Sequence, residues 1–360
     1  MSFSMKERDC IKVKLVEAIG SSAGAKGFNA SSYAHEQGIS VQTVYRYLRQ
    51  LEAEGRLIIE RRGKTNAYSL ADKSYSFEFA LNEITEDRVW GEFIRPLLKE
   101  LPETAHVNCN YAFTEMLNNA IEHSGGSLVT ITVMDNSYRV LISISDNGIG
   151  IFTKIAGAMN LAEKRYAVLE LAKGKFTTDP ESHTGEGIFF SSKATDSFFI
   201  SSDELIFVPL NPTAADNGIG SVLRDDKRPL PQKGSTIVFT LLYNRKQTAK
   251  ELFDRFTEEP EHYGFTKTIV PVRLLEYGDD SALFTSRSQA KRLLVRFERF
   301  KHIELDFDGV GEIGQGFADE VFRVFANRHP EVTLYATHCS EQVMRMINRA
   351  KGNAANGGSK

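Results

Sequence analysis

Apolar residues recur at helical spacing in the stretch ISVQTVYRYLRQLEAEG. Val44, Leu48 and Leu51 fall on one face of the helix that this spacing predicts. Ser40 is a favourable N-cap immediately before the apolar positions, and Gly55 is a favourable C-terminal stop. The pattern predicts a helix that begins after Ser40 and ends before Gly55.

The segments on either side of this helix have different patterns. NASSYAHEQG predicts a shorter helix, with Asn29 or Ser31 as its N-cap and Gly38 at its end. After Gly55 the apolar period changes to two in RLIIERRGKTNAYSL, which predicts a hairpin with Gly63 at or near its tip. Two helices joined by a tight turn are typical of helix-turn-helix geometry.

Charge changes the interpretation of this N-terminal segment. Residues 1–72 contain eleven Lys and Arg against eight Asp and Glu, a local net charge of +3 in a chain whose total is −3. A helix-turn-helix followed by a basic hairpin resembles the winged-helix family of bacterial transcription regulators, over roughly residues 5–70. The resemblance implies that the second helix lies in the DNA major groove and that the hairpin reaches phosphates. Docking to another protein remains the alternative.

The residues that the resemblance places on DNA come from the second helix and the hairpin. They are Gln42, Thr43, Arg46, Arg49, Arg61, Arg62 and Lys64, with Tyr45 as a further candidate.

Between residues 74 and 245 helical and strand patterns alternate. RVWGEFIRPLLKEL and VNCNYAFTEMLNNAIEHSGG predict amphipathic helices, and LVTITVMDNSYRVLISISDNG predicts two alternating strands with a turn at MDNSY. This order of elements predicts an α/β sandwich.

The second of these helices carries polar residues on one face. Glu115, Asn119 and His123 are spaced at i, i+4 and i+8, and Glu122 lies close to the same stripe. Burying such a stripe without a ligand would be costly. An amide oxygen beside a carboxylate suits a bound Mg²⁺ together with a group that orients or deprotonates a nucleophile.

Glycine-rich turns follow in three places. The first strand pair delivers Asp146 into a turn with Gly148 and Gly150, where a carboxylate can accept a hydrogen bond from an exocyclic amine. HTGEGIFFSS places Gly185 and Gly187 at a helix start, where backbone N–H groups can meet phosphates. KGSTIVFTLLY then enters a strand through glycine and hydroxyl residues.

These motifs, in this order, resemble the N, G1, G2 and G3 boxes of the GHKL ATPases, a family that includes DNA gyrase, heat-shock chaperones, sensor histidine kinases and anti-sigma serine kinases. The resemblance covers about 100–245. It implies ATP and Mg²⁺ as cofactors, with Asn119 as the magnesium ligand, Asp146 on the adenine amino group and Glu115 as the catalytic base. The glycines and serine that it places around the nucleotide are Gly148, Gly150, Gly185, Gly187 and Ser235.

Three details qualify this resemblance. An acid at Glu115 favours hydrolysis or phosphoryl transfer to a hydroxyl over histidine autophosphorylation, and no dimerisation helix pair is found upstream. Glu186 stands between the G2 glycines, where a carboxylate is unfavourable beside a triphosphate unless it points away. A lid is expected at about 152–187, in which Lys173 or Lys175 could reach phosphates or simply belong to a solvated face.

The pentapeptide DNGIG occurs a second time, at Asp216. This copy follows TGEG and has no helix with an acid and an amide behind it. Asn217 and Gly218 suit a type I′ turn, so one nucleotide site and one hairpin are predicted.

The last segment has a βαβ rhythm. HIELDFDGVGEIGQGFADEVFRVF resembles the STAS fold of anti-anti-sigma factors, and more closely the STAS-like domain found fused to GHKL modules. The turn Gly314, Gln315, Gly316 lacks the hydroxyl that is phosphorylated in anti-anti-sigma factors, so docking without phosphorylation is expected. A plain structural turn is the alternative.

Composition limits the class of protein. The chain of 360 residues, 41% hydrophobic and 25% charged, is long enough for two or three globular cores. Cys10, Cys109 and Cys339 are far apart, which predicts reduced structural thiols rather than disulfides or a zinc site. The charged start and the lack of a long apolar run predict a cytoplasmic protein without membrane contact.

The sequence therefore predicts a multidomain α/β protein. The expected divisions are a winged helix at 1–72, a GHKL domain at 73–246, a linker at 247–265, a STAS-like domain at 266–351 and a disordered tail at 352–360. The leading hypothesis is an ATP-controlled, DNA-binding regulator. An anti-sigma-type serine kinase and a non-catalytic, ATP-bound adaptor are the alternatives, and a regulatory protein partner and a homodimer are both compatible with this organisation.

Overall fold

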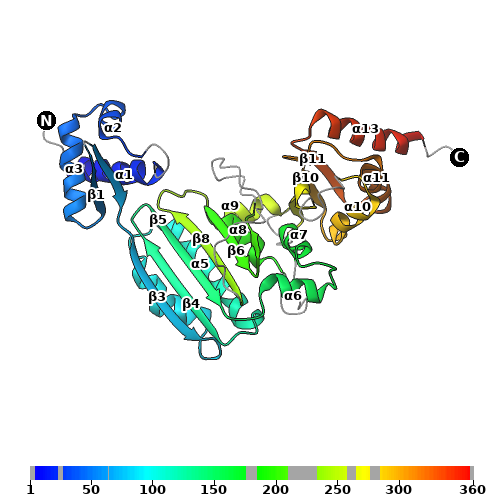
Figure 1. Cartoon of the computed structure of the whole chain (residues 1–360), viewed down its shortest axis with the longest axis horizontal. Coiled ribbons are helices and arrows are strands. Elements are labelled where there is room, and N and C mark those ends of the chain that lie inside the picture. The colour runs from blue at the N-terminus through cyan, green and yellow to red at the C-terminus, as the bar shows by residue number, and fades with distance from the viewer. Residues whose placement is uncertain are drawn as a thin grey trace.

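The computed structural model describes residues 5–22, 27–63, 65–175, 185–209, 233–257, 265–275 and 284–356. The chain is a mixed α/β protein with several sheets (Figure 1). Its buried apolar side chains form two clusters, one in the N-terminal segment and one shared by the rest of the chain.

The N-terminal segment contains three helices and a hairpin. Asn29 caps the second helix by accepting from the N–H groups of Ser31 and Ser32, and the Ser40 hydroxyl accepts from the N–H of Thr43 at the start of the third. Both caps agree with the sequence prediction, as does the hairpin, in which Gly63 has φ +64°. The elements are α1 (Met5–Ser21), α2 (Ala30–Glu36), α3 (Val41–Ala53), β1 (Leu57–Arg62) and β2 (Thr65–Leu70).

The middle of the chain is built on a six-stranded sheet in which neighbouring strands are antiparallel. The strand order is β3-β4-β5-β8-β6-β7. The strands are β3 (Lys73–Ala80), β4 (Leu128–Asp135), β5 (Arg139–Asp146), β6 (Ser197–Ser202), β7 (Leu205–Phe207) and β8 (Ser235–Leu242). Strand β3 was not predicted from the sequence.

Helices pack against this sheet. The long helix α5 contacts β5 and β8, and α8 packs along α5. The helices of this part are α5 (Glu103–His123), α6 (Ile151–Ala158), α7 (Tyr166–Lys173), α8 (Gly187–Ala194) and the 3₁₀ turn η1 (Leu81–Glu83).

The stretch predicted as a single helix at RVWGEFIRPLLKEL is helical but not uniform. It contains α4 (Glu86–Val89), the π-helical η2 (Trp90–Ile94) and the 3₁₀ helix η3 (Arg95–Leu97). Pro96 has no N–H to donate to the preceding turn, so a regular α-helical ladder cannot continue through it.

The C-terminal segment contains a parallel three-stranded sheet, in the order β11-β10-β9, with helices between its strands. Its strands are β9 (Lys267–Pro271), β10 (His302–Asp306) and β11 (Thr333–Thr337). Its helical elements are η4 (Val272–Leu275), α10 (Arg287–Leu294), η5 (Phe297–Arg299), α11 (Gln315–Asp319), η6 (Glu320–Phe325), α12 (Ala326–Arg328) and α13 (Glu341–Asn356). Helix α13 extends into the part expected to be a disordered tail.

The expected linker at 247–265 contains a helix, α9 (Ala249–Phe256). Thr248 and Glu251 form a capping box at its start, and Leu252 and Phe256 are buried one turn apart. The ring of Phe256 lies 5.1 Å from that of Phe189 on α8. The apolar face of α9 is therefore part of the core rather than a solvated connection.

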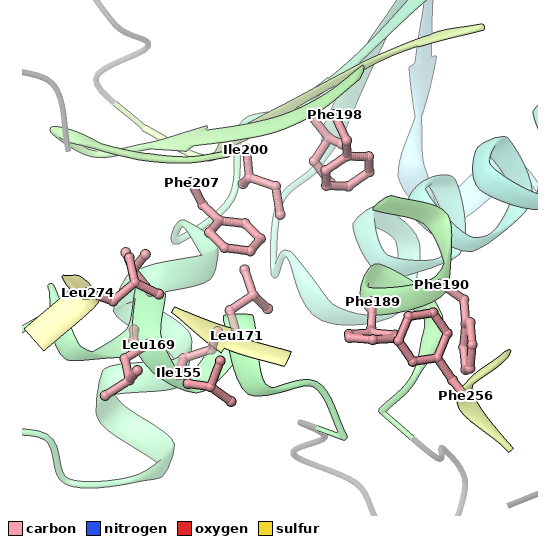
Figure 2. Packing of buried hydrophobic residues seen from close by; sticks show 14 of the residues in the cluster. Ile155, Leu169, Leu171, Phe189, Phe190, Phe198, Ile200, Phe207, Phe256 and Leu274 are labelled. Carbon is pink, nitrogen blue, oxygen red and sulfur yellow. The ribbon is translucent and has the colours of Figure 1, made fainter. Parts of the chain in front are cut away.

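A single hydrophobic cluster runs from the six-stranded sheet into the C-terminal segment. Figure 2 shows Leu169 and Leu171 of α7 near Leu274, with Phe189, Phe190 and Phe256 gathered in a second group. Phe265 lies 4.3 Å from Phe189, measured between ring centroids. The middle and C-terminal segments therefore share one core.

The N-terminal cluster receives one side chain from the large sheet. Tyr138, in the turn between β4 and β5, packs against that cluster, and a Cβ placed on Gly20 would lie 2.3 Å from its ring. Asn136 in the same turn donates to Asp72 at 2.9 Å. The β4–β5 turn is thus where the sheet contacts the N-terminal helices.

Candidate functional site

A cavity of about 300 Å³ opens between α5, the end of β5, and helices α6, α7 and α8. Most of the residues expected around a nucleotide line it together. They are Glu115, Asn119, Asp146, Gly150, Gly185, Gly187 and Ser235. These residues come from widely separated parts of the chain, and the fold brings them to one place.

Asp146 is the buried carboxylate of this cavity. Strand β5 alternates between buried and partly exposed positions, and Asp146 falls on the buried face after Val140, Ile142 and Ile144. Burial raises the pKa of Asp146, and backbone hydrogen bonds, including those from Gly148 and Ser235, offset part of that rise. The side chain accepts from the N–H of Gly148 at 2.8 Å. A carboxylate held at the wall of a cavity can accept a hydrogen bond from a ligand amine.

The glycines next to Asp146 allow close packing of the turn. Gly148 does not line the cavity; a Cβ there would lie 2.2 Å from the carbonyl oxygen of Ser124, at the end of α5. Gly150 has φ +85°, and a Cβ there would lie 2.5 Å from the hydroxyl of Ser202. Both positions therefore require glycine, one to seat the turn on α5 and the other to shape the cavity wall.

Ser235 connects the last strand motif to the cavity. Its buried hydroxyl accepts from the N–H of Ile151 at 2.9 Å, at the first residue of α6. This bond satisfies one N–H at the start of α6, and it holds α6 against β8.

The polar stripe on α5 faces the cavity, as its spacing predicts. Glu115, Asn119 and His123 all line it. A Cβ at Gly187 would lie 2.1 Å from Oε2 of Glu115, so the carboxylate rests directly against the first residue of α8. Glu115 and Asn119 bring a carboxylate and an amide oxygen to the same cavity, and oxygen atoms of this kind are the ligands that Mg²⁺ takes in proteins.

Glu186 does not line the cavity. Burial lowers the pKa of Lys175, and the charge of Glu186 opposes this effect. Burial is also the main reason that the pKa of Tyr111 is raised, with Glu115 and Glu186 adding to the effect. The charge of Glu186 thus acts on both Lys175 and Tyr111.

Several residues of the cavity were not found by sequence reasoning. Lys154 lines it from α6, one turn after Gly150, and donates to the carbonyl oxygen of His123 at 2.8 Å. Burial lowers the pKa of Lys154. Its position four residues after the glycine turn is the only sequence feature that could have indicated it.

Lys173 and Lys175 do not line the cavity. Lys173 is 0% exposed, so it is neither in a solvated face nor available to a ligand there. Lys175 donates to the carbonyl oxygen of Arg299, in the C-terminal segment, at 3.1 Å. Lys173 and Lys175 are thus both directed toward the C-terminal part of the chain.

The residues expected on DNA lie on the N-terminal helices and hairpin. Those on α3 and β1 are exposed, apart from Thr43, which is half-buried and whose hydroxyl lies 2.9 Å from that of Ser40. The exposed ones are Gln42, Tyr45, Arg46, Arg49, Arg61 and Arg62. Lys64 lies outside the described residues, as does the second DNGIG at 216–220.

Residues 289–344 match a family described as a STAS-like domain of unknown function (DUF4325). The match covers most of α10, all of β10, α11 and β11, and the turn at Gly314. The chain therefore contains a STAS-like domain at this end. No curated protein matches the chain.

Within the described residues, none of the helices has the length and apolar character needed to cross a membrane.

Proposed function

We propose that this chain is an ATP-binding and ATP-hydrolysing regulator of the GHKL type, with an N-terminal winged helix that binds DNA. The observation that carries the proposal is the cavity in which Glu115, Asn119 and Asp146 meet beside glycines from two further segments. One buried carboxylate, one amide and one second carboxylate in a single cavity fit a purine nucleotide with its metal.

Each residue has a role in this proposal. Asp146 accepts a hydrogen bond from the exocyclic amine of the base. Helix α8 begins at Gly187 in the cavity wall, so its first N–H groups are available to phosphate oxygens. Asn119 would hold Mg²⁺, which neutralises charge on the phosphates. Glu115 orients and deprotonates the attacking water.

The test of the nucleotide function uses the purified full-length chain with γ-labelled ATP and Mg²⁺, alone and with a cell extract as the source of partner proteins. We expect label to appear as free phosphate. Label transferred to a hydroxyl of a partner protein would instead make the chain an anti-sigma-type serine kinase. ATP that stays bound and intact would make it an adaptor in which ATP is a structural ligand.

DNA binding is proposed from the arrangement of exposed cations on α3 and β1. Arg46 is exposed on α3, and Arg62 ends β1 beside the hairpin turn. We expect Arg46→Ala to weaken binding, and Arg62→Ala to reduce the slope of log affinity against log salt concentration by about one unit, because one phosphate contact is lost. Fluorescence anisotropy with duplex DNA across a salt series measures both.

Arg88→Ala is a matched control for Arg62→Ala. Each arginine is exposed and paired with a glutamate, Arg62 with Glu60 at 3.1 Å and Arg88 with Glu92 at 3.2 Å. Both variants lose the same charge, but Arg88 lies on α4, outside the N-terminal segment. A salt slope that stays the same in Arg62→Ala would favour a winged helix that docks on protein.

A further inference from the structure

Helix α7 has two functional faces. Leu171, together with Gly174 just after the helix, lines the cavity. Glu170 and Lys173 are 3% and 0% exposed, and they are covered by the C-terminal segment instead. One short helix is thus shared between the cavity wall and the STAS-like domain.

The ammonium group of Lys173 donates hydrogen bonds both to α7 and to the C-terminal segment. Its Nζ donates to Oε1 of Glu170 at 2.6 Å and to the carbonyl oxygens of Arg292 and Val295, at 3.2 and 3.0 Å. The hydroxyl of Thr268 donates to the Lys173 carbonyl at 2.8 Å. Burial lowers the pKa of Lys173 to about 8, although Glu170 opposes this effect.

Arg296 of the STAS-like domain holds the end of α7. Its guanidinium lies 3.2 Å from Oε2 of Glu170 and donates to the carbonyl oxygen of Gly174 at 2.8 Å and to that of Lys175. Arg296 is 8% exposed. It has φ +66°, a conformation that costs a non-glycine residue energy and persists where the surrounding contacts fix it.

An outer pair of contacts extends this interface. Arg292 donates to the hydroxyl of Tyr166 at 2.6 Å, and its guanidinium lies 4.6 Å from the centre of the tyrosine ring. The ammonium of Lys175 lies 5.1 Å from the centre of the Phe300 ring. The STAS-like domain therefore contacts α7 at its first residue, along its buried face and just beyond its last residue.

The end of α7 lies toward the Glu115 side of the cavity. A Cβ at Gly174 would lie 3.1 Å from the ring of Phe189, two residues after Gly187 on α8. Gly187 in turn rests against Glu115, whereas Asp146 packs beside Gly148 and Gly234. Gly174 is thus connected through Phe189 and α8 to Glu115, and on this basis we assign it to the phosphate side of the proposed nucleotide site.

We infer that Arg296 is a positioning residue for the nucleotide site. Through Glu170 and the backbone of Gly174, the STAS-like domain fixes the wall of the cavity on its phosphate side. Coupling between two sites is reciprocal, so nucleotide phosphates would in turn strengthen the docking of the STAS-like domain on α7. This inference rests on the proposed nucleotide function.

The experiment compares ATP with adenosine, which has the base but no phosphates, by isothermal titration of the full-length chain. We expect Arg296→Met to weaken ATP binding about tenfold and to change adenosine binding by less than about twofold. Arg296→Lys, which keeps the charge but loses the two-pronged geometry, should recover only part of the ATP affinity.

Arg287→Met is the control for loss of an arginine from the same segment. Arg287 lies on α10 of the same segment and pairs with Asp319 at 3.4 Å, away from α7. The Arg287→Met variant should bind ATP and adenosine as the wild type does. Removing Arg296 takes one partner from the buried carboxylate of Glu170, which can prevent folding. If a thermal melt shows that Arg296→Met is unfolded, the titration is repeated with Tyr166→Phe and Arg292→Met. For these variants we expect a smaller loss of ATP affinity and no change in adenosine affinity.

Other outcomes overturn the inference. Equal losses for ATP and adenosine in a folded variant would mean general loosening rather than positioning of the phosphate side. Unchanged affinity for both would mean that the STAS-like domain has no effect on the cavity. Failure of the proposed nucleotide function can be distinguished from failure of this inference, because the wild type would then bind neither ATP nor adenosine.

Discussion

Asp146→Asn is expected to weaken nucleotide binding severely. The carboxylate lies at the cavity wall, is 8% exposed and accepts from the N–H of Gly148, which fixes its orientation. Asparagine has the same shape, but its NH₂ group is a donor. In one orientation it would face the amine of the ligand, which is also a donor, and in the other it would face the N–H of Gly148. A charge-assisted hydrogen bond is worth about 1.5–3 kcal/mol, so we expect ATP affinity to fall by about tenfold to a hundredfold or more.

Isothermal titration with ATP and with adenosine measures this loss, which should affect both ligands because it concerns the base. Asp254→Asn on α9 is the control, since Asp254 is exposed and does not line the cavity. Wild-type affinity in Asp146→Asn would show that the base does not bind at this carboxylate. The loss of both ligands also separates this variant from Arg296→Met, which should affect ATP alone.

Glu115→Gln is expected to keep ATP binding and stop turnover. The side chain rests against Gly187 at the start of α8, and glutamine occupies nearly the same volume without a basic oxygen. Loss of a general base lowers the rate by about a hundredfold to ten-thousandfold. Phosphate release at saturating ATP gives the turnover, and titration gives the affinity.

Glu122→Gln provides the comparison for this variant. Glu122 is on the same helix, is exposed and lies 3.9 Å from His123, but it does not line the cavity. It should hydrolyse ATP as the wild type does. Turnover at the wild-type rate in Glu115→Gln would show that Glu115 is not the general base. Lys154 and His123 would then be the remaining candidates in the cavity.

The cavity could be anticipated from sequence where the evidence was local. The spacing of Glu115 and Asn119 on one helix places both on one face, and the alternation of β5 places Asp146 on the buried side. These periodicities are properties of the helix and the strand themselves. They therefore do not depend on contacts with the rest of the chain.

The features that sequence could not reveal depend on contacts between distant segments. Strand β3 pairs with β4 across more than forty intervening residues, from Ala80 opposite Leu128. Lys173 looks like a surface residue in its own helix, and its burial depends on the carbonyls of Arg292 and Val295, from a distant segment, in addition to Glu170. Local propensity carries no information about either arrangement.

The same reasoning applies to α9. Its segment contains many charged residues and precedes a proline, which suggested a connection between domains. Leu252 and Phe256 nevertheless meet a group of phenylalanines from α8 and the C-terminal segment. These phenylalanines from other segments, rather than the residues of α9 alone, make the helix part of the core.

The shared interface around α7 also limits how the chain can diversify. Exchange of the STAS-like domain for an unrelated one would take Arg296 from Glu170 and the carbonyls of Arg292 and Val295 from Lys173, a change that costs several kcal/mol. Replacement of α7 alone would leave Arg296 buried without its carboxylate. These two segments are therefore constrained to be inherited together, whereas the N-terminal helices have a core of their own and are freer to be exchanged.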